Sequence, residues 1–345
     1  MRPKKIKTEQ KGFVVIVVLC MVIMLSVLLL GFNYESRSNL RTVDDFRKSQ
    51  QALNCAKAGL NIAIAAAKDT PDIHNDKSLL DLFSGEETFA VDEGTCSITI
   101  SEESGKLNVN HLKDKNGNMD RTRIEQLLRL IDLLSEKEAG HSNIGYGFVP
   151  SIIDWIDSDD QVECLPFIKK DNLGAESSYY GQLKPPYRCR NKALETTEEL
   201  LLVKGITPQI FDCIRDHLTV YGDGKININC APKLILESLS ENMDAALAQL
   251  IIDRRKFKPF ESIAELRDMP GMTDGLYQAI SKVTTVEPTD QYYHVTSRGE
   301  VDNLGRTVTS ILRRNTETKN IDVILYKELS GLAVTAFAEQ ETKRR

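Results

Sequence analysis

The sequence predicts an α+β fold in which one long N-terminal helix, half of it transmembrane, packs on an antiparallel sheet, with a large α-helical domain inserted between the strands. Three observations lead to this prediction. A run of 20 uncharged residues near the N-terminus passes directly into an amphipathic helical pattern. Segments with the alternation of strands occur before residue 101 and again after residue 290. The stretch between them carries helical patterns and an internal repeat.

The uncharged run from Phe13 to Phe32 is long enough to cross a membrane, because 20 helical residues span roughly 30 Å. Five bases and one acid lie in residues 1–12, which predicts that the N-terminus stays in the cytoplasm and that everything after Asn33 is outside. A buried helix of a soluble protein and a cleaved secretory signal are the alternatives. The run lacks the small residues at its end where secretory signals are cut, so we expect a membrane anchor.

The charge of the chain is uneven. The net charge is −6, but residues 13–345 hold 39 bases against 49 acids, a net charge of −10. An acidic body argues against a nucleic-acid partner, because contacts with phosphates supply most of that affinity. It leaves room for a bound cation.

Residues 34–68 continue the apolar run as an amphipathic helix, which Thr70-Pro71 should end. The apolar residues recur at three-, four- and seven-residue steps: Leu40, Val43, Phe46, Leu53, Ala56, Leu60 and Ile64. Strands are expected at 87–91, 96–100, 292–296, 307–312 and 321–326, and the tail after Lys327 is expected to be loose.

The middle of the chain contains an internal repeat whose matching segments keep the same order. Residues 105–110 match 224–229, residues 152–154 match 251–253, and Glu-Leu followed by Gly recurs at 199–205 and 265–271. Each unit is expected to form a strand, a helix and a short helical hairpin with Gly at its turn. The first unit holds about 33 extra residues, roughly 155–190, which form an acidic insertion.

The hairpins at Gly205 and Gly271 resemble helix-hairpin-helix turns. In DNA-binding versions, a second Gly lies two residues later and the backbone N–H groups hold a phosphate. Here Thr207 and Thr273 occupy that place. Together with the negative charge, this predicts a structural or protein-binding use.

The acidic insertion is a candidate calcium site, because calcium takes six to eight oxygen ligands. The candidate ligands are Asp157, Asp159, Asp160 and Glu176. A solvated acidic loop is the alternative. The Asp- and Asn-rich segment 114–120 lacks the order of an EF-hand loop, so we expect a turn there.

Seven cysteines are present, one of them, Cys20, in the predicted span. The other six would face an oxidising compartment and allow 15 pairings. Sequence proximity favours the two disulfides Cys164–Cys189 and Cys213–Cys230, which leaves Cys55 and Cys96; free buried thiols are the alternative. The five histidines are scattered and no catalytic motif occurs, so we expect no enzymatic activity.

Several blocks together resemble the K-type minor pseudopilins of type II secretion systems, over almost the whole chain from Phe13 to about Tyr326. The N-terminal junction Lys11-Gly12-Phe13 is similar to a prepilin leader. The more specific blocks are the segments 154–159, 174–176, 185–187, 199–205 and 226–232. Most pilins carry Glu at the fifth mature position, but this chain has Val17 there, and the K type is the subgroup that resembles this.

The resemblance implies a pilin-like body with an inserted helical domain of helix-hairpin-helix-like or SAM-like units, and calcium near the acidic insertion. It implies cleavage by prepilin peptidase after Gly12 and methylation of Phe13. The protein would lie in the cell inner membrane as a single-pass protein, with its C-terminal domain in the periplasm. There it would join the I- and J-type minor pseudopilins at the tip of the pseudopilus and help to start the filament that exports folded proteins. A minor pilin of a type IV pilus and a membrane-anchored periplasmic hydrolase are the alternatives.

The expected organisation has six parts. They are a leader (1–12), the transmembrane part of the helix (13–32), the periplasmic helix with the first strands (33–110), the inserted helical domain with the first repeat unit (111–222), the second repeat unit (223–285), and the C-terminal strands and tail (286–345).

Overall fold

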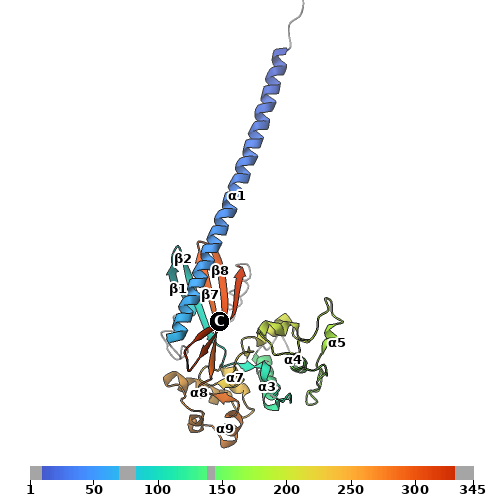
Figure 1. The fold of residues 1–345 in the computed structure, drawn as a ribbon, viewed down its shortest axis with the longest axis vertical. Coiled ribbons are helices and arrows are strands. Elements are labelled where there is room, and N and C mark those ends of the chain that lie inside the picture. Colours follow the sequence, from blue (N-terminus) through green and yellow to red (C-terminus); the bar gives the residue numbers. More distant parts are fainter. Residues whose placement is uncertain (1–9, 70–82, 115, 138–143, 331–345) are drawn as a thin grey trace, which may run out of the picture.

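The computed structural model describes residues 10–69, 83–114, 116–137 and 144–330. A long helix leads into a sheet, and a group of shorter helices lies at the end of the sheet away from the free half of that helix (Figure 1). Residues 1–9 of the expected leader and most of the expected tail lie outside the described residues. The predicted fold class is confirmed.

Helix α1 (Gln10–Asp69) is continuous, as the sequence predicts, and it ends directly before Thr70-Pro71. Its two halves have different surroundings. Nearly all apolar side chains from Phe13 to Phe32 are exposed, whereas most of those from Ala52 onward pack against the sheet. Among the described residues, α1 is the one helix long and apolar enough to cross a membrane.

The sheet has five antiparallel strands in the order β1-β2-β7-β8-β9. The strands are β1 (Ser84–Val91), β2 (Gly94–Glu102), β7 (Asp290–Val301), β8 (Leu304–Asn315) and β9 (Ile321–Ser330). All five expected strands are present. The expectation of a loose chain directly after Lys327 is wrong, because β9 stays paired with β8 as far as Ser330.

Strands β2 and β7 pair along their length, from Thr95 opposite Glu300 to Glu102 opposite Tyr293. Everything between these two strands is therefore an insertion at one end of the sheet. Helix α1 covers one face of the sheet and comes very close to it. A Cβ on Gly299 would lie 2.0 Å from the carbonyl oxygen of Ala52, so this contact requires glycine.

The insertion consists of two units, each closed by a short parallel pair of strands. The first runs through β3 (Leu107–Asn108), η1 (Val109–His111), α3 (Arg121–Lys137), α4 (Phe148–Ile156), α5 (Ser177–Tyr180), η2 (Thr197–Leu202), α6 (Pro208–Ile214) and β4 (Leu218–Thr219). The second runs through β5 (Ile226–Asn227), α7 (Lys233–Ser238), α8 (Ala245–Phe257), η3 (Ile263–Asp268), α9 (Asp274–Ile280) and β6 (Thr284–Thr285). Helix α3 packs on α7, and one hydrophobic core extends through both units.

The repeated asparagines have equivalent roles in the two units. The side-chain oxygen of Asn110 accepts from Leu194 N, and its amide donates to Val220 O. Asn229 does the same with Phe260 N and Val286 O. Each Asn therefore ties the chain directly after the first strand of its unit to the segments that precede the helical hairpin and follow the last strand.

The hairpin turns are also equivalent. Gly205 and Gly271 have φ angles of +88° and +92°, the left-handed region that favours glycine. Thr207 and Thr273 cap the helices that follow, accepting from Ile210 N and Leu276 N respectively. The threonines at the place of a second glycine thus bond N–H groups of their own helices.

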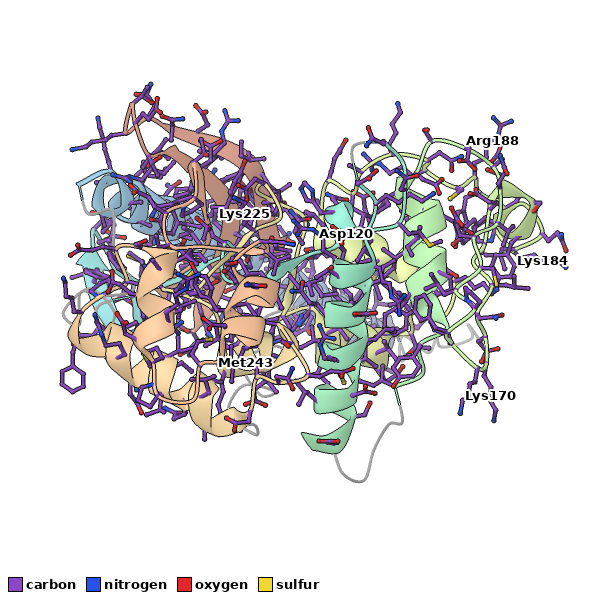
Figure 2. All side chains as sticks on the ribbon, turned by 90° about the horizontal axis from the view of Figure 1, so that it is seen from below. Asp120, Lys170, Lys184, Arg188, Lys225 and Met243 are labelled. Carbon is purple, nitrogen blue, oxygen red and sulfur yellow. The ribbon has the colours of Figure 1, made fainter. Side chains whose placement is uncertain are left out.

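The acidic insertion lies at the outer edge of the first unit. Figure 2 shows Lys170, Lys184 and Arg188 around its periphery, with their side chains directed outward. Much of this stretch has no regular structure beyond the four residues of α5. It is held by scattered backbone hydrogen bonds, such as Leu165 N to Asn172 O, and by side-chain contacts with α4 and the first hairpin, such as Glu163 N to Asp154 Oδ1 and Tyr187 Oη to Leu202 O.

Candidate metal centre

Three carboxylates converge where the acidic insertion meets α4. Asp154 lies in the last turn of α4, Asp157 caps its C-terminus, and Glu176 precedes α5. One oxygen from each lies within 4.8 Å of the others. Asp154 and Glu176 are 0% and 1% exposed.

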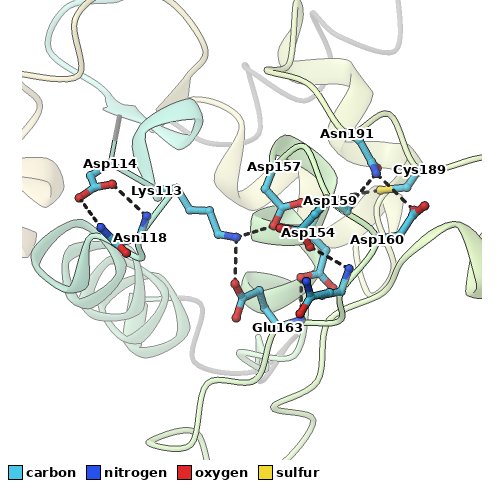
Figure 3. A network of polar contacts seen from close by, with 11 residues as sticks. Lys113, Asp114, Asn118, Asp154, Asp157, Asp159, Asp160, Glu163, Cys189 and Asn191 are labelled. Carbon is cyan, nitrogen blue, oxygen red and sulfur yellow. Dashed lines mark hydrogen bonds and ion pairs between the residues drawn. The ribbon is translucent and has the colours of Figure 1, made fainter. Parts of the chain in front are cut away.

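The protein fixes one oxygen of each aspartate and leaves the other free. Asp154 Oδ1 accepts from the backbone N–H of Glu163 at 2.9 Å, and Asp157 Oδ2 accepts from Lys113 Nζ at 2.6 Å (Figure 3). Within the described part of the chain, Asp154 Oδ2, Asp157 Oδ1 and both oxygens of Glu176 are buried without a hydrogen-bond partner. Buried anionic oxygens without partners are costly, so this arrangement fits a cation that binds between them.

Gly174 provides the space for this cluster. A Cβ at residue 174 would lie 2.0 Å from Asp154 Oδ2 and 2.8 Å from Pro150 O. Its own N–H donates to Glu163 O at 3.0 Å, which holds the turn before Glu176 against the segment that orients Asp154. Glycine at the first position of the Gly-Ala-Glu block is therefore required by its packing against Asp154.

Burial raises the pKa of Asp154 to about 7, and the charges of Asp157 and Glu163 add to this effect. Burial also raises the pKa of Glu176 to about 7, helped by the charges of Asp154, Asp157 and Asp160. Without a cation, the ionised cluster is therefore unfavourable near neutral pH. A divalent cation would offset both the lost hydration and the repulsion.

The structure brings together only part of the ligand set expected from the sequence. Asp157 and Glu176 belong to the cluster, and Asp154 joins them although it was not among the ligands expected from the sequence. Asp159 Oδ1 instead accepts from Gln161 N at 2.8 Å, and Asp160 Oδ1 accepts from the Asn191 side chain at 3.3 Å; both aspartates are exposed. The position of Asp154 three residues before Asp157 places both on one helix face, which is a signal for proximity but not for their contact with Glu176.

The donor set is one of hard oxygen ligands, which suits calcium or magnesium. The thiol of Cys189 lies beside Glu176, but burial raises its pKa to about 12, so it stays protonated. The Asp-rich turn near residue 114 is different: Asp114 Oδ1 accepts from Asn116 N and Asn118 N, as in the turn expected there.

All seven cysteines are free thiols in the structure. Cys55 on α1 and Cys96 on β2 are both buried in the core between the helix and the sheet. Cys164 is exposed and Cys189 buried. Cys213 lies on α6 of the first unit. Cys230 follows β5 in the second unit, where Glu102 and Arg255 are its charged neighbours. The proposed pairings stay predictions.

Comparison with known families accounts for the two units. Two family models, both described as type II secretion system protein K, match residues 105–223 and 226–287. These ranges correspond to the two units closed by β3–β4 and β5–β6, and together they cover more than half of the chain. The chain belongs to the type II secretion system protein K family.

Individual relatives agree with this membership. The K-family chain is 26% identical over 230 residues to type II secretion system protein K of Pseudomonas aeruginosa, covering 66% of this chain and 63% of that protein. The protein of the same name from Aeromonas hydrophila is 21% identical over 191 residues, 52% of this chain and 53% of the relative. The matched region thus spans between half and two thirds of each relative.

A solved structure shows the same fold. The K-family chain matches the structure of the GspK-GspI-GspJ complex from the type 2 secretion system of enterotoxigenic Escherichia coli with a TM-score of 0.64 and 21% identity. The match covers 85% of this chain and 100% of the matched chain. It supports the combination of long helix, antiparallel sheet and inserted helical domain.

Proposed function

We propose that this chain is a minor pseudopilin that ends the pseudopilus of a type II secretion system and helps to start its assembly. Its role would be structural and not catalytic. The observation that carries the proposal is the place of the inserted domain: both units lie beyond the end of the sheet, opposite the free half of α1 (Figure 1). A subunit with this bulk at its far end suits the end of a filament better than its shaft.

The N-terminus supports the same position. A carboxylate in a membrane segment is costly and is kept where a partner group requires it. In pilins, Glu at the fifth mature position would pair with the amine of a neighbour, and Val17 cannot do so. The amine of Phe13 could still pair with a Glu of another subunit. The chain could therefore form this amine–carboxylate pair with one neighbour in the filament but not with a second.

Processing and location follow from this assignment. Prepilin peptidase would cut after Gly12, and Phe13 would be methylated. Helix α1 would anchor the chain in the inner membrane with its N-terminus in the cytoplasm and the sheet and both units in the periplasm. The chain matched in the Escherichia coli complex accompanies GspI and GspJ; by analogy, we propose I- and J-type partners here.

Calcium is the proposed cofactor, bound by Asp154, Asp157 and Glu176. The free, buried oxygens of these residues support this assignment. Bound between α4 and the turn before α5, the ion would order the insertion, which has little regular structure of its own.

The assembly role can be tested by stoichiometry. We expect the full chain, purified in detergent with the I- and J-type subunits of the same system, to form a discrete complex with one copy of each. In sheared filaments it should be far less abundant than the major pseudopilin. Copies repeated along the shaft, or no association with the I and J types, would contradict the proposal. Association instead with the minor pilins of a type IV pilus would support the main alternative.

A further inference from the structure

We propose that Lys113 is a built-in counter-cation of the carboxylate centre. It fixes Asp157 as a ligand with one free oxygen, stabilises the centre when no metal is bound, and lowers its affinity for a divalent cation. This inference rests on the proposed binding of calcium and concerns how that binding is regulated.

Lys113 is positioned inside the site and not at its rim. Its side chain is 9% exposed, and Nζ lies 2.6 Å from Asp157 Oδ2 and 2.8 Å from Glu163 Oε1. The backbone N–H of Glu163 in turn donates to Asp154 Oδ1. Figure 3 shows this chain of contacts from Lys113 to both aspartates. One ammonium group therefore connects two of the three carboxylates, the second through Glu163.

Backbone contacts on either side of the Asp114–Asn118 segment hold Lys113 in this place. Lys113 forms an antiparallel bridge with Met119, and the backbone N–H of Asp114 donates to Asn118 O at 2.7 Å. The Asp114 carboxylate accepts from Asn118 N and from its side-chain amide. These contacts between Asp114 and Asn118 fix the backbone next to Lys113, so that the lysine side chain reaches the centre.

The lysine limits how the aspartate can bind a metal. With Oδ2 of Asp157 engaged by the ammonium and Oδ1 of Asp154 engaged by a backbone N–H, each aspartate has one oxygen left. Both oxygens of Glu176 are unpartnered. Calcium accepts both one-oxygen and two-oxygen carboxylate ligands, so Glu176 is the member of the cluster that can bind through two oxygens.

The charge of Lys113 acts in opposite directions on the two states. Without metal, its positive charge offsets part of the repulsion among four neighbouring carboxylates. With metal, the same charge repels a divalent cation that lies one carboxylate away. Even at the dielectric constant of water, Coulomb repulsion over such a separation corresponds to roughly a tenfold change in Kd. A lysine that only packed against Asp157 or only oriented it would not both stabilise the metal-free protein and weaken metal binding.

The test compares Lys113→Met, which removes the charge, with Lys113→Arg, which keeps it. Lys106→Met is the matched control, because Lys106 forms a partly buried ion pair with Glu103 at 2.6 Å that belongs to no part of the centre. The full chain in detergent is stripped with a chelator. Its thermal unfolding is recorded without metal, and calcium chloride is titrated by calorimetry, with magnesium chloride in a parallel series.

We expect Lys113→Met to unfold at a lower temperature than the wild type without metal and to bind calcium about tenfold more tightly. Lys113→Arg should keep a Kd close to that of the wild type. Lys106→Met should lower the unfolding temperature without changing the Kd. A Lys113→Met chain that folds only when calcium is added would support the proposal in its strongest form.

A folded Lys113→Met chain with unchanged or weaker calcium binding would overturn the inference and leave the calcium site standing. A Lys113→Met chain that stays unfolded at saturating calcium would also overturn the inference. Lys113 would then be needed for folding whether or not calcium is bound. A wild-type chain that binds no calcium would overturn the proposed cofactor and this inference with it.

Discussion

Substitution of Gly174 by alanine should act directly on the carboxylate centre. The added methyl group would lie 2.0 Å from Asp154 Oδ2, 2.6 Å from its Cγ and 2.8 Å from Pro150 O, well inside ordinary contact distance. Because one of these atoms belongs to the backbone of α4, the overlap cannot be relieved by a side-chain rotation alone. The expected displacement of Asp154 would also weaken its hydrogen bond from Glu163 N.

Overpacking of this kind costs typically 1–3 kcal/mol, and a hydrogen bond to a charged group contributes about 1.5–3 kcal/mol. We therefore expect Gly174→Ala to destabilise the helical units by about 2 kcal/mol, or roughly 4–8 °C in Tm for a region of this size. The stabilisation by calcium, about 2.7 kcal/mol at a hundredfold excess over Kd, should shrink as well, because Asp154 would be moved.

The assay is thermal unfolding of the full chain in detergent, with chelator and with calcium. Gly275→Ala is the matched control: Gly275 is exposed on α9, and a Cβ there meets nothing within 4 Å. Alanine at this helical position should leave stability unchanged or raise it by up to about 1 kcal/mol. If Gly174→Ala behaved like Gly275→Ala in both conditions, the close packing of the turn on Asp154 would be refuted.

Three further predictions concern the ligands, pH and processing. Asp154→Asn should abolish most of the rise in Tm with calcium, and Asp159→Asn should retain it. The reverse result would show that the ligands are the exposed aspartates of the loop and not the buried cluster. Because the pKa values of Asp154 and Glu176 are raised to about 7 in the folded state, above their unfolded values near 4, the metal-free protein should lose stability as pH rises from about 4 to 7. The rise in Tm with calcium should therefore be larger at pH 7.5 than at pH 5, and a pH-independent rise would contradict this linkage. Intact mass of the protein from its native host should show loss of residues 1–12 and one methyl group on Phe13; an uncut chain would rule out processing after Gly12.

The elements that depend on local pattern could be predicted from the sequence. The uncharged run and the amphipathic pattern that follows it gave one continuous helix, which ends at Asp69 because the next two residues are Thr70-Pro71. The alternating segments predicted all five strands, and each observed strand contains the residue range that was expected for it. The repeat was visible because equivalent backbone positions need the same residues, such as Asn110 and Asn229 directly after the first strand of each unit.

What the sequence could not show was which carboxylates meet. Asp157, Asp159 and Asp160 are close in sequence, but only Asp157 faces Glu176 and the interior, because its place at the end of α4 directs it there. Asp154 lies among apolar residues of α4, so its neighbours in the sequence did not mark it as a ligand. Its role depends on a contact with Gly174, twenty residues away, and its orientation depends on Glu163 N.

The sequence by itself thus determined the long apolar helix, the strands, the repeat and the family, because each depends on local spacing or on residues at fixed positions. Only the tertiary structure decided the composition of the metal centre and the place of Lys113. Burial decides whether a carboxylate is left without water, and burial is a property of the packed chain. The Asp- and Asn-rich segment after Lys113 was considered as a metal motif from the sequence. In the structure its hydrogen bonds hold the neighbouring Lys113, whose Nζ lies 2.6 Å from Asp157 Oδ2.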